Sequence, residues 1–357
     1  NSYSGYASSG TDGLDGFVRV FKEVDNVWTQ IGSDIADITQ GDGTGGKATI
    51  SLNSDGTILA VGSLKADSGN GAGRVFEYNS GTDSWSQLGS TLYGDNASSH
   101  DFFGTSVDLN DDGTILAVGA PIDIGGVDYV SGNTEAGYVK VYKYASDSWS
   151  EFGTNSEGET QLKAGIRGSL AGVTIGSYSD CFGICVSFND DGTTLAVGAR
   201  FLDLAITQVQ TGMGCMTVFK YSSEGDVWMN YGQPIFPDSD QSNQAADSVS
   251  LSSDGNTMLI GNRLESDGDG VDSRGSSHIY KYIGGQWVLT AGPFFGIQGN
   301  GPHVSAVSMS SDGTRFVHGM FTNDDIDSTS GAIQAFQIDY EPTLQIKDGI
   351  MNALTGI

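Results

Sequence analysis

The residues of this chain that could do chemistry are mostly acidic and lie in segments rich in glycine. The segment Glu265-Ser-Asp267-Gly-Asp269-Gly-Val-Asp272 places carboxylates at nearly alternating positions, and carboxylates so spaced can converge on one cation. We predict a calcium site with Asp267, Asp269 and Asp272 as ligands, and no other cofactor. The alternative is a solvated acidic loop. A similar cluster, Asn323-Asp324-Asp325-Ile-Asp327, follows later in the chain.

Residues suited to catalysis are not gathered in this way. The chain has no Gly-x-Ser-x-Gly elbow, no His-Glu-x-x-His motif and no phosphate-binding loop. We interpret its four histidines as structural variants rather than ligands, because they are far apart in sequence: His100, His278, His303 and His318. We therefore expect a protein that is not an enzyme. A hydrolase with its site in loops is kept as a second alternative.

Three cysteines, Cys181, Cys185 and Cys215, could form one disulfide. Cys181 and Cys185 are four residues apart on an expected strand, about 13 Å, which is too far for a disulfide. Cys215 could pair with Cys181 or with Cys185, and we predict the pair Cys181–Cys215. Three reduced thiols in the core are the alternative.

One sequence of the form Asn-x-Ser/Thr is present, Asn96-Ala97-Ser98. We predict Asn96 as a glycosylation site, since such sites are used in secreted proteins. The longest departure from the repeat described below is the Gly-, Ser- and Thr-rich segment 153–181. It is our first candidate contact surface, because loops on a rigid scaffold often carry recognition.

The elements that must position these residues repeat along the chain. A phrase typified by Asp108-Leu-Asn-Asp-Asp112-Gly-Thr-Ile-Leu-Ala-Val-Gly119 has five copies, within 47–63, 103–121, 182–200, 246–263 and 303–320. A second phrase has a Gly, an alternating strand with aromatics and then a Trp, and lies at 16–32, 73–89, 137–153, 216–232 and 277–292. A sixth copy at 331–349 lacks the Trp. Such internal repetition indicates an array of small supersecondary units.

Each unit is expected to contain four antiparallel strands. An Asp-Gly hairpin joins the first two strands, the second is apolar on both faces, the third alternates, and the fourth carries the Trp. Small residues on inner strands and aromatics further out are typical of a propeller blade. The aromatic residues would fill the space between blades; an aromatic platform for glycans is the minority interpretation.

The fold class predicted is therefore all-β, a β-propeller with six blades, or seven as the alternative. It forms one domain over 1–349, followed by a tail at 350–357. Five inner phrases and six outer phrases leave the first blade incomplete, with residues 1–15 as a loop. We expect the missing strands to come from a longer polypeptide or from a neighbouring subunit, because exposed strand edges are avoided.

The segment Asp101-Phe-Phe103-Gly104…Gly119-Ala-Pro121 resembles an FG-GAP repeat, the blade unit of integrin α-chain-like propellers, in its Trp-containing variant. Phe182-Gly183 with Gly198-Ala199 is a second good copy, and the other three are degenerate. The resemblance implies an extracellular module for adhesion or ligand recognition. Many FG-GAP repeats also bind calcium between their first two strands. We do not carry that site over to Asp55, Asp112, Asp191, Asp254 or Asp312, whose tight turns supply too few oxygens.

The formal net charge of −28 bears on partners. It repels phosphate backbones and anionic membranes, so we exclude nucleic acid and membrane insertion. We predict a secreted, acidic glycoprotein that acts as an adhesion or structural protein–protein interaction module within a larger extracellular assembly. Its partners would be proteins or neighbouring subunits. The first alternative is a calcium-assisted glycan-binding module.

Overall fold

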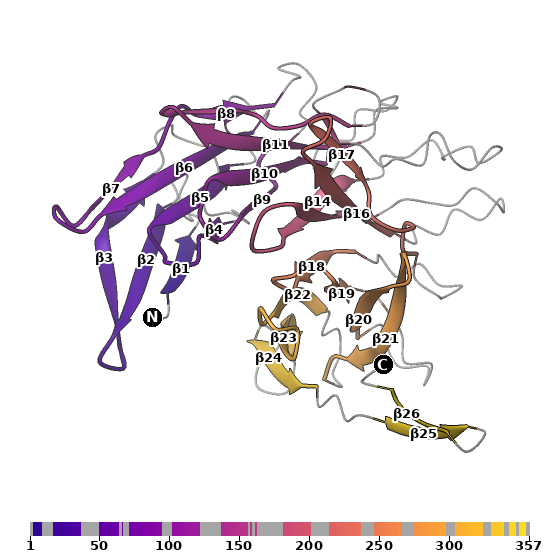
Figure 1. Cartoon of the computed structure of the whole chain (residues 1–357). Coiled ribbons are helices and arrows are strands. Elements are labelled where there is room, and N and C mark those ends of the chain that lie inside the picture. Colours follow the sequence, from indigo (N-terminus) through magenta and orange to yellow (C-terminus); the bar gives the residue numbers. More distant parts are fainter. Residues whose placement is uncertain are drawn as a thin grey trace, which may run out of the picture.

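The structure is a computed structural model, and the strands that it contains are shown in Figure 1. It describes residues 3–8, 17–36, 50–63, 66, 71–94, 102–121, 137–155, 158, 161–162, 181–200, 214–236, 246–263, 265, 274–297, 304–323, 330–338, 343–347 and 350–354. These residues form 26 strands, all paired antiparallel with their neighbours in a sheet.

Four consecutive sheets contain the four strands predicted for a blade, in meander order. Sheet 2 contains β4 (Ile50–Leu52), β5 (Ile58–Ser63), β6 (Ala72–Asn79), β7 (Ser84–Gln87) and the added β8 (Leu92–Tyr93). Sheet 3 contains β9 (Ser106–Leu109), β10 (Ile115–Ala120), β11 (Tyr138–Ala145), β12 (Ser148–Glu151) and the added β13 (Gln161–Leu162). Sheet 4 contains β14 (Phe182–Phe188), β15 (Thr194–Ala199), β16 (Cys215–Ser222) and β17 (Val227–Asn230). Sheet 5 contains β18 (Ser248–Leu251), β19 (Thr257–Asn262), β20 (Ser276–Ile283) and β21 (Gln286–Phe295).

A three-stranded sheet stands at each end of this series. Sheet 1 contains β1 (Tyr3–Ser8), β2 (Phe17–Val24) and β3 (Val27–Ala36), and sheet 6 contains β22 (Val304–Met309), β23 (Arg315–Asn323) and β24 (Ser330–Gln337). The sheets follow one another around a centre, with their first strands innermost (Figure 1). The five sheets that carry the Asp-Gly phrase, sheets 2 to 6, are therefore blades of an all-β propeller, as the repeat predicts.

The two ends differ from the sequence prediction. Residues 1–15 were expected to form a loop, but Tyr3–Ser8 pairs with β2, with Ser8 opposite Phe17. Among the described residues, sheet 1 thus has every strand of a blade except the innermost one. The reason is that β2 would otherwise present a free edge, and native sheets avoid such edges.

The last sheet lacks its outermost strand, although 331–349 was expected to supply two strands. Thr343–Lys347 forms β25, which pairs with β26 (Ile350–Leu354) instead of with β24. An Asp-Gly pair stands between β25 and β26 in the sequence, and it favours a local two-residue hairpin. The segment itself contains no Trp to bind it to sheet 5, whereas the fourth strand of each of sheets 2 to 5 contains one.

The Asp-Gly turns are longer than the two-residue hairpins that the sequence predicts. The amide of Asn53 bonds to the carbonyl of Ile58 at 3.0 Å, so four residues lie in the turn. Gly56 has a φ of +70°, which favours glycine. The Asp55 carboxylate accepts a hydrogen bond from the amide of Thr57 at 3.0 Å, as Asp side chains in turns commonly do.

The core lies between sheets. In sheet 3, Leu116 and Val118 pack toward sheet 2, whereas Ala117, Val139 and Val141 pack toward sheet 4. Both faces of the inner strands are buried, as the unbroken apolar runs predict. We call the face turned toward the preceding sheet the backward face, and the opposite one the forward face.

A series of hydrogen bonds also joins the innermost strands around the centre. Ser51 Oγ accepts from the amide of Leu109 at 3.0 Å, and Asp108 Oδ2 accepts from the amide of Phe188 at 2.7 Å. The same bond recurs from Leu251 N to Ser187 Oγ at 3.0 Å and from Met309 N to Ser250 Oγ at 3.1 Å. The first residue of each of the first four phrases therefore joins its sheet to the next.

None of the helical residues that the structure describes forms a segment long and apolar enough to span a bilayer.

Candidate functional site: the exposed faces of the terminal sheets

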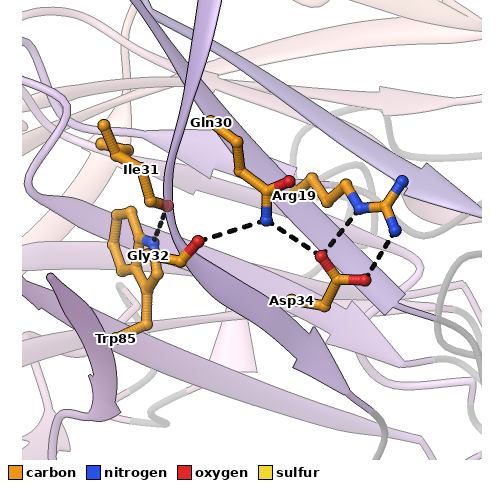
Figure 2. Close-up of polar contacts among 6 residues, drawn as sticks. All are labelled: Arg19, Gln30, Ile31, Gly32, Asp34 and Trp85. Carbon is orange, nitrogen blue, oxygen red and sulfur yellow. Dashed lines mark hydrogen bonds and ion pairs between the residues drawn. The ribbon is translucent and has the colours of Figure 1, made fainter.

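Neighbouring sheets are held together at the rim by tryptophan. Trp85 Nε1 on sheet 2 donates to the carbonyl of Ile31 on sheet 1 at 3.1 Å, and Figure 2 shows this bond. Equivalent bonds run from Trp149 to Leu88 at 2.9 Å, from Trp228 to Phe152 at 3.0 Å and from Trp287 to Tyr231 at 2.7 Å. The prediction that the Trp residues fill the space between blades is confirmed for these four.

Glycine makes room for each indole. The carbonyl that accepts the bond is followed by Gly32, Gly89, Gly153 or Gly232, each with a positive φ. A Cβ on Gly89 would lie 2.7 Å from Trp149 Cδ1, closer than real contacts allow. The Gly after the fourth strand and the Trp of the next sheet thus form one interlocking unit.

No sheet of the described residues covers the backward face of sheet 1, which carries the first tryptophan. Trp28 on sheet 1 is 50% exposed, whereas Trp149 at the same place in sheet 3 is 8% exposed. Phe17 and Phe21 share the backward face with Trp28 and are only partly buried. The equivalent residues of sheet 3, Tyr138 and Tyr142, are buried.

Polar contacts keep this backward face ordered. Arg19, between Phe17 and Phe21 on β2, binds the carboxylate of Asp34 through two bonds of 2.7 and 2.8 Å (Figure 2). Gln30 Nε2 donates to the same carboxylate at 3.0 Å and to the Gly32 carbonyl at 3.2 Å. The Arg19 hydrogen bond holds the pKa of Asp34 below its usual value. The face therefore presents aromatic rings around a fixed guanidinium–carboxylate pair.

On sheet 6 the exposed face is the opposite one, the forward face. Val317 and Ile333 are 38% and 77% exposed, and Ala335 beside Val317 in the register is exposed too. In sheet 3 the same places hold Ala117, Val139 and Val141, all buried against sheet 4. Ser308 stands at the place equivalent to Ser51, Ser187 and Ser250, whose hydroxyls accept the hydrogen bonds between innermost strands. Ser308 is exposed.

These two surfaces therefore expose residues at places that neighbouring sheets cover elsewhere in the chain. An apolar patch set on regular strands, with ordered polar groups beside it, is typical of a protein–protein contact. In Figure 1 sheet 1 and sheet 6 lie apart at the two ends of the arc.

A second feature is a polar cluster at the edge of sheet 5. Glu265 Oε2 lies 2.6 Å from His278 Nε2 and accepts a hydrogen bond from Asn262 Nδ2 at 3.0 Å. Ser276 Oγ bonds Glu265 Oε2 and lies 2.9 Å from His278 Nε2. Burial would raise the pKa of Glu265, but the His278 contact and the other hydrogen bonds hold it below its usual value.

Most sequence-predicted site residues lie outside the described residues. This holds for the predicted calcium ligands Asp267, Asp269 and Asp272, for the glycosylation candidate Asn96, for His100 and His303, and for most of 153–181. Within the described ranges, no group of three or more His, Cys, Asp or Glu side chains is placed to hold a metal ion. His318 is fully buried and bonds Ser277 and Gln334, as a structural role predicts.

The predicted disulfide Cys181–Cys215 is not formed in this structure, where all three cysteines are thiols. Ala199 on β15 pairs with Cys215 on one side and with Phe182, the neighbour of Cys181, on the other. Two strand spacings, about 10 Å, therefore separate the two cysteines, beyond the reach of a disulfide. Cys185 donates to the Ala246 carbonyl at 3.2 Å, and burial raises the pKa of its thiol.

Sequence reasoning missed the two exposed faces and the polar cluster. The faces could have been found by writing the repeats in register, because Trp28 then has no preceding carbonyl to bind. The cluster could not be found in this way, since Glu265 lies outside the strands and the repeat does not predict that it contacts His278.

No protein-family model matches the chain, and no curated protein matches it. Among solved structures, the chain is similar to a Bacteroides uniformis protein described as a candidate 6-phosphogluconolactonase. The TM-score is 0.50 at 11% identity, over 96% of this chain and 84% of that one. It is also similar to the β-propeller domain of the Trilobed protease from Pyrococcus furiosus, with a TM-score of 0.45 and 11% identity over 99% of this chain and 82% of that one. At these identities the first likeness concerns the fold alone.

Proposed function

We propose that this protein is an extracellular, non-enzymatic interaction module that assembles through the faces at the two ends of its arc. The observation that carries the proposal is that Trp28 and Ile333 are exposed at places that are covered in every inner sheet. Sheet 1 counts as the sixth blade in this proposal. Its backward face binds the forward face of sheet 6 of a second copy.

Both halves of such a contact occur inside the chain. The forward face of sheet 3 binds the backward face of sheet 4 through Val139 and Val141 on one side and Phe219 and Trp228 on the other. A second copy would extend this same packing, which is continuous with the five interfaces already formed between neighbouring sheets. The extracellular placement rests on the resemblance of the Phe-Gly and Gly-Ala phrases to FG-GAP repeats.

The test is sedimentation velocity at increasing protein concentration, in 0.15 M NaCl or above so that the net charge of −28 is screened. We expect the wild type to associate and Ile333→Asp to remain monomeric. Met229→Asp, at a side chain 49% exposed on β17, is the matched control and should associate as the wild type does.

A mixing experiment separates this contact from others. Trp28→Asp keeps the forward face of sheet 6, and Ile333→Asp keeps the backward face of sheet 1. Each variant alone should be monomeric, and an equimolar mixture should form dimers and nothing larger. A wild type that stays monomeric at all concentrations, or a mixture that stays monomeric, would overturn the proposal.

A further inference from the structure

The polar cluster of sheet 5 has the arrangement of a metal site. We propose that Asn262, Glu265, Ser276 and His278 bind one divalent first-row metal ion. The site is independent of the terminal faces. It also differs from the predicted calcium loop, since its ligands include an imidazole and lie on strand ends.

The first argument is convergence. Atoms of three side chains, Glu265 Oε2, Ser276 Oγ and His278 Nε2, are all within hydrogen-bonding distance of one another. Asn262 adds a fourth polar atom 3.0 Å from Glu265 Oε2. Ligands at right angles around an ion with bonds of about 2.1 Å are about 3 Å apart. Glu265 Oε2, Ser276 Oγ and His278 Nε2 therefore converge as three ligands on one face of a six-coordinate shell would, and the 2.6 Å between Glu265 Oε2 and His278 Nε2 would widen toward about 3 Å around an ion.

The second argument is an amide oxygen without a partner. Asn262 is 4% exposed, and its Oδ1 has no hydrogen-bond partner within the described structure. The oxygen and nitrogen of an amide are assigned by their neighbours, and exchanging them would direct Oδ1 at the Glu265 carboxylate. Two oxygens that meet in this way repel each other unless a cation lies between them. As placed, Nδ2 donates to Glu265 and Oδ1 is left without a partner; in the exchanged orientation a bound cation would give the buried Oδ1 a partner.

The third argument comes from the equivalent places in other sheets. His278 lies opposite Ile260, as Lys140 lies opposite Val118. In sheet 3 the buried Lys140 binds the carboxylate of Glu151 at 2.6 Å, and in sheet 1 Arg19 binds Asp34. Both sheets supply a permanent positive charge to their carboxylate. Sheet 5 has an imidazole there instead, and a metal ion would supply the charge.

The ligand set indicates the class of ion. Calcium takes oxygen ligands almost exclusively, whereas imidazole combined with carboxylate suits manganese, iron or zinc. Ser276 is fully buried and His278 is 8% exposed, so protein atoms would surround much of the ion. Mn²⁺ is the probe of choice, because its electron paramagnetic resonance signal reports free and bound ion directly.

The experiment is a titration of the intact chain with Mn²⁺ in 0.15 M NaCl, followed by electron paramagnetic resonance. We expect one site of highest affinity, weakened at least tenfold by His278→Gln and by Glu265→Gln. His318→Gln is the matched control, because His318 is another buried histidine with hydrogen-bond partners but no carboxylate. Circular dichroism establishes that each variant is folded.

A second variant keeps the test decisive where His278→Gln fails to fold. Asn262→Asp should bind Mn²⁺ several-fold more tightly if the cluster is a metal site, because it adds a charged ligand. If the cluster is only a hydrogen-bond network, the same change sets two carboxylates together, lowers the melting temperature and leaves Mn²⁺ binding unchanged. That result, or Mn²⁺ binding equal in the wild type and His278→Gln, would overturn the proposal.

Discussion

The indole nitrogen of Trp149 donates a hydrogen bond to the carbonyl oxygen of Leu88 across 2.9 Å, and so joins sheet 3 to the end of the outermost strand of sheet 2. The indole itself is 8% exposed and belongs to the core cluster between the two sheets, which includes Val75 and Leu92 of sheet 2. One side chain thus contributes both a hydrogen bond and apolar contact to the interface between two sheets.

Replacing this indole should therefore cost stability. We expect Trp149→Phe to lower the free energy of unfolding by about 2 kcal/mol, through the lost hydrogen bond and a partly unfilled space. Trp28→Phe, at the half-exposed equivalent on sheet 1, should cost less than about 0.5 kcal/mol. Urea denaturation of both variants measures the difference. Equal losses would show that the Leu88 bond contributes nothing.

The glycine that follows the accepting carbonyl should be as sensitive to substitution as the indole. Gly89 has a φ of +76° and no room for a Cβ beside Trp149. We expect Gly89→Ala to cost about 3 kcal/mol, from backbone strain and from crowding of the indole. Gly285 also has a positive φ but has open space around it, so Gly285→Ala should cost only about 1 kcal/mol. Thermal melts of the pair separate crowding from strain.

The carboxylate of Asp108 should make stability depend on pH. It lies among three sheets and accepts hydrogen bonds from Ser51 Oγ and Phe188 N, and burial raises its pKa to about 6. A folded pKa above the unfolded value of 3.8 means that the folded state holds the proton more tightly. The contribution of Asp108 to stability is therefore greatest below about pH 4 and is lost as the pH rises toward 6.

The variant Asp108→Ser tests this dependence. Serine stands at the equivalent places Ser51, Ser187 and Ser250, and accepts the same amide hydrogen bond there. The stability of the variant relative to the wild type should rise by about 2 kcal/mol between pH 4 and pH 6. Subtracting the wild-type curve removes the titration of the other carboxylates. A constant difference would mean that Asp108 titrates normally.

The three cysteines provide a direct check on the pairing. Alkylation in denaturant without reductant should add three groups per chain, because Cys181, Cys185 and Cys215 are thiols. Intact mass spectrometry counts the groups. A product with only one group would restore the predicted disulfide.

The repeated phrases predicted most of the fold because they encode local geometry. The Asp-Gly turns, the buried second strand and the Trp strand each depend on a few neighbouring residues. Their places were predicted correctly in the four complete sheets, although the turns contain four residues and not the two expected. The pairing of Tyr3–Ser8 with β2 was missed, because a short segment of Ser, Gly and Tyr has the composition of a loop. That strand is fixed by the edge it covers and not by its own preference.

The chemistry was harder to predict than the fold. Asp108 stands where the other copies of the phrase have Ser. Its raised pKa, however, depends on burial by two other sheets. Glu265 was counted with its acidic neighbours in the sequence, whereas its contacts are with His278, Ser276 and Asn262. Such contacts depend on how strands of different sheets are placed against each other and on the segments that connect strands. The period of the repeat does not encode either.

The bonds from each sheet to the next also determine how the molecule responds to force. Trp85, Trp149, Trp228 and Trp287 each join adjacent sheets only, and the axial bonds do the same. Stability in such an array is carried by nearest-neighbour terms. Tension applied at sheets 1 and 6 would therefore act on one interface after another. An extension trace should show a series of separate ruptures, and the molecule would lengthen in steps of about one blade.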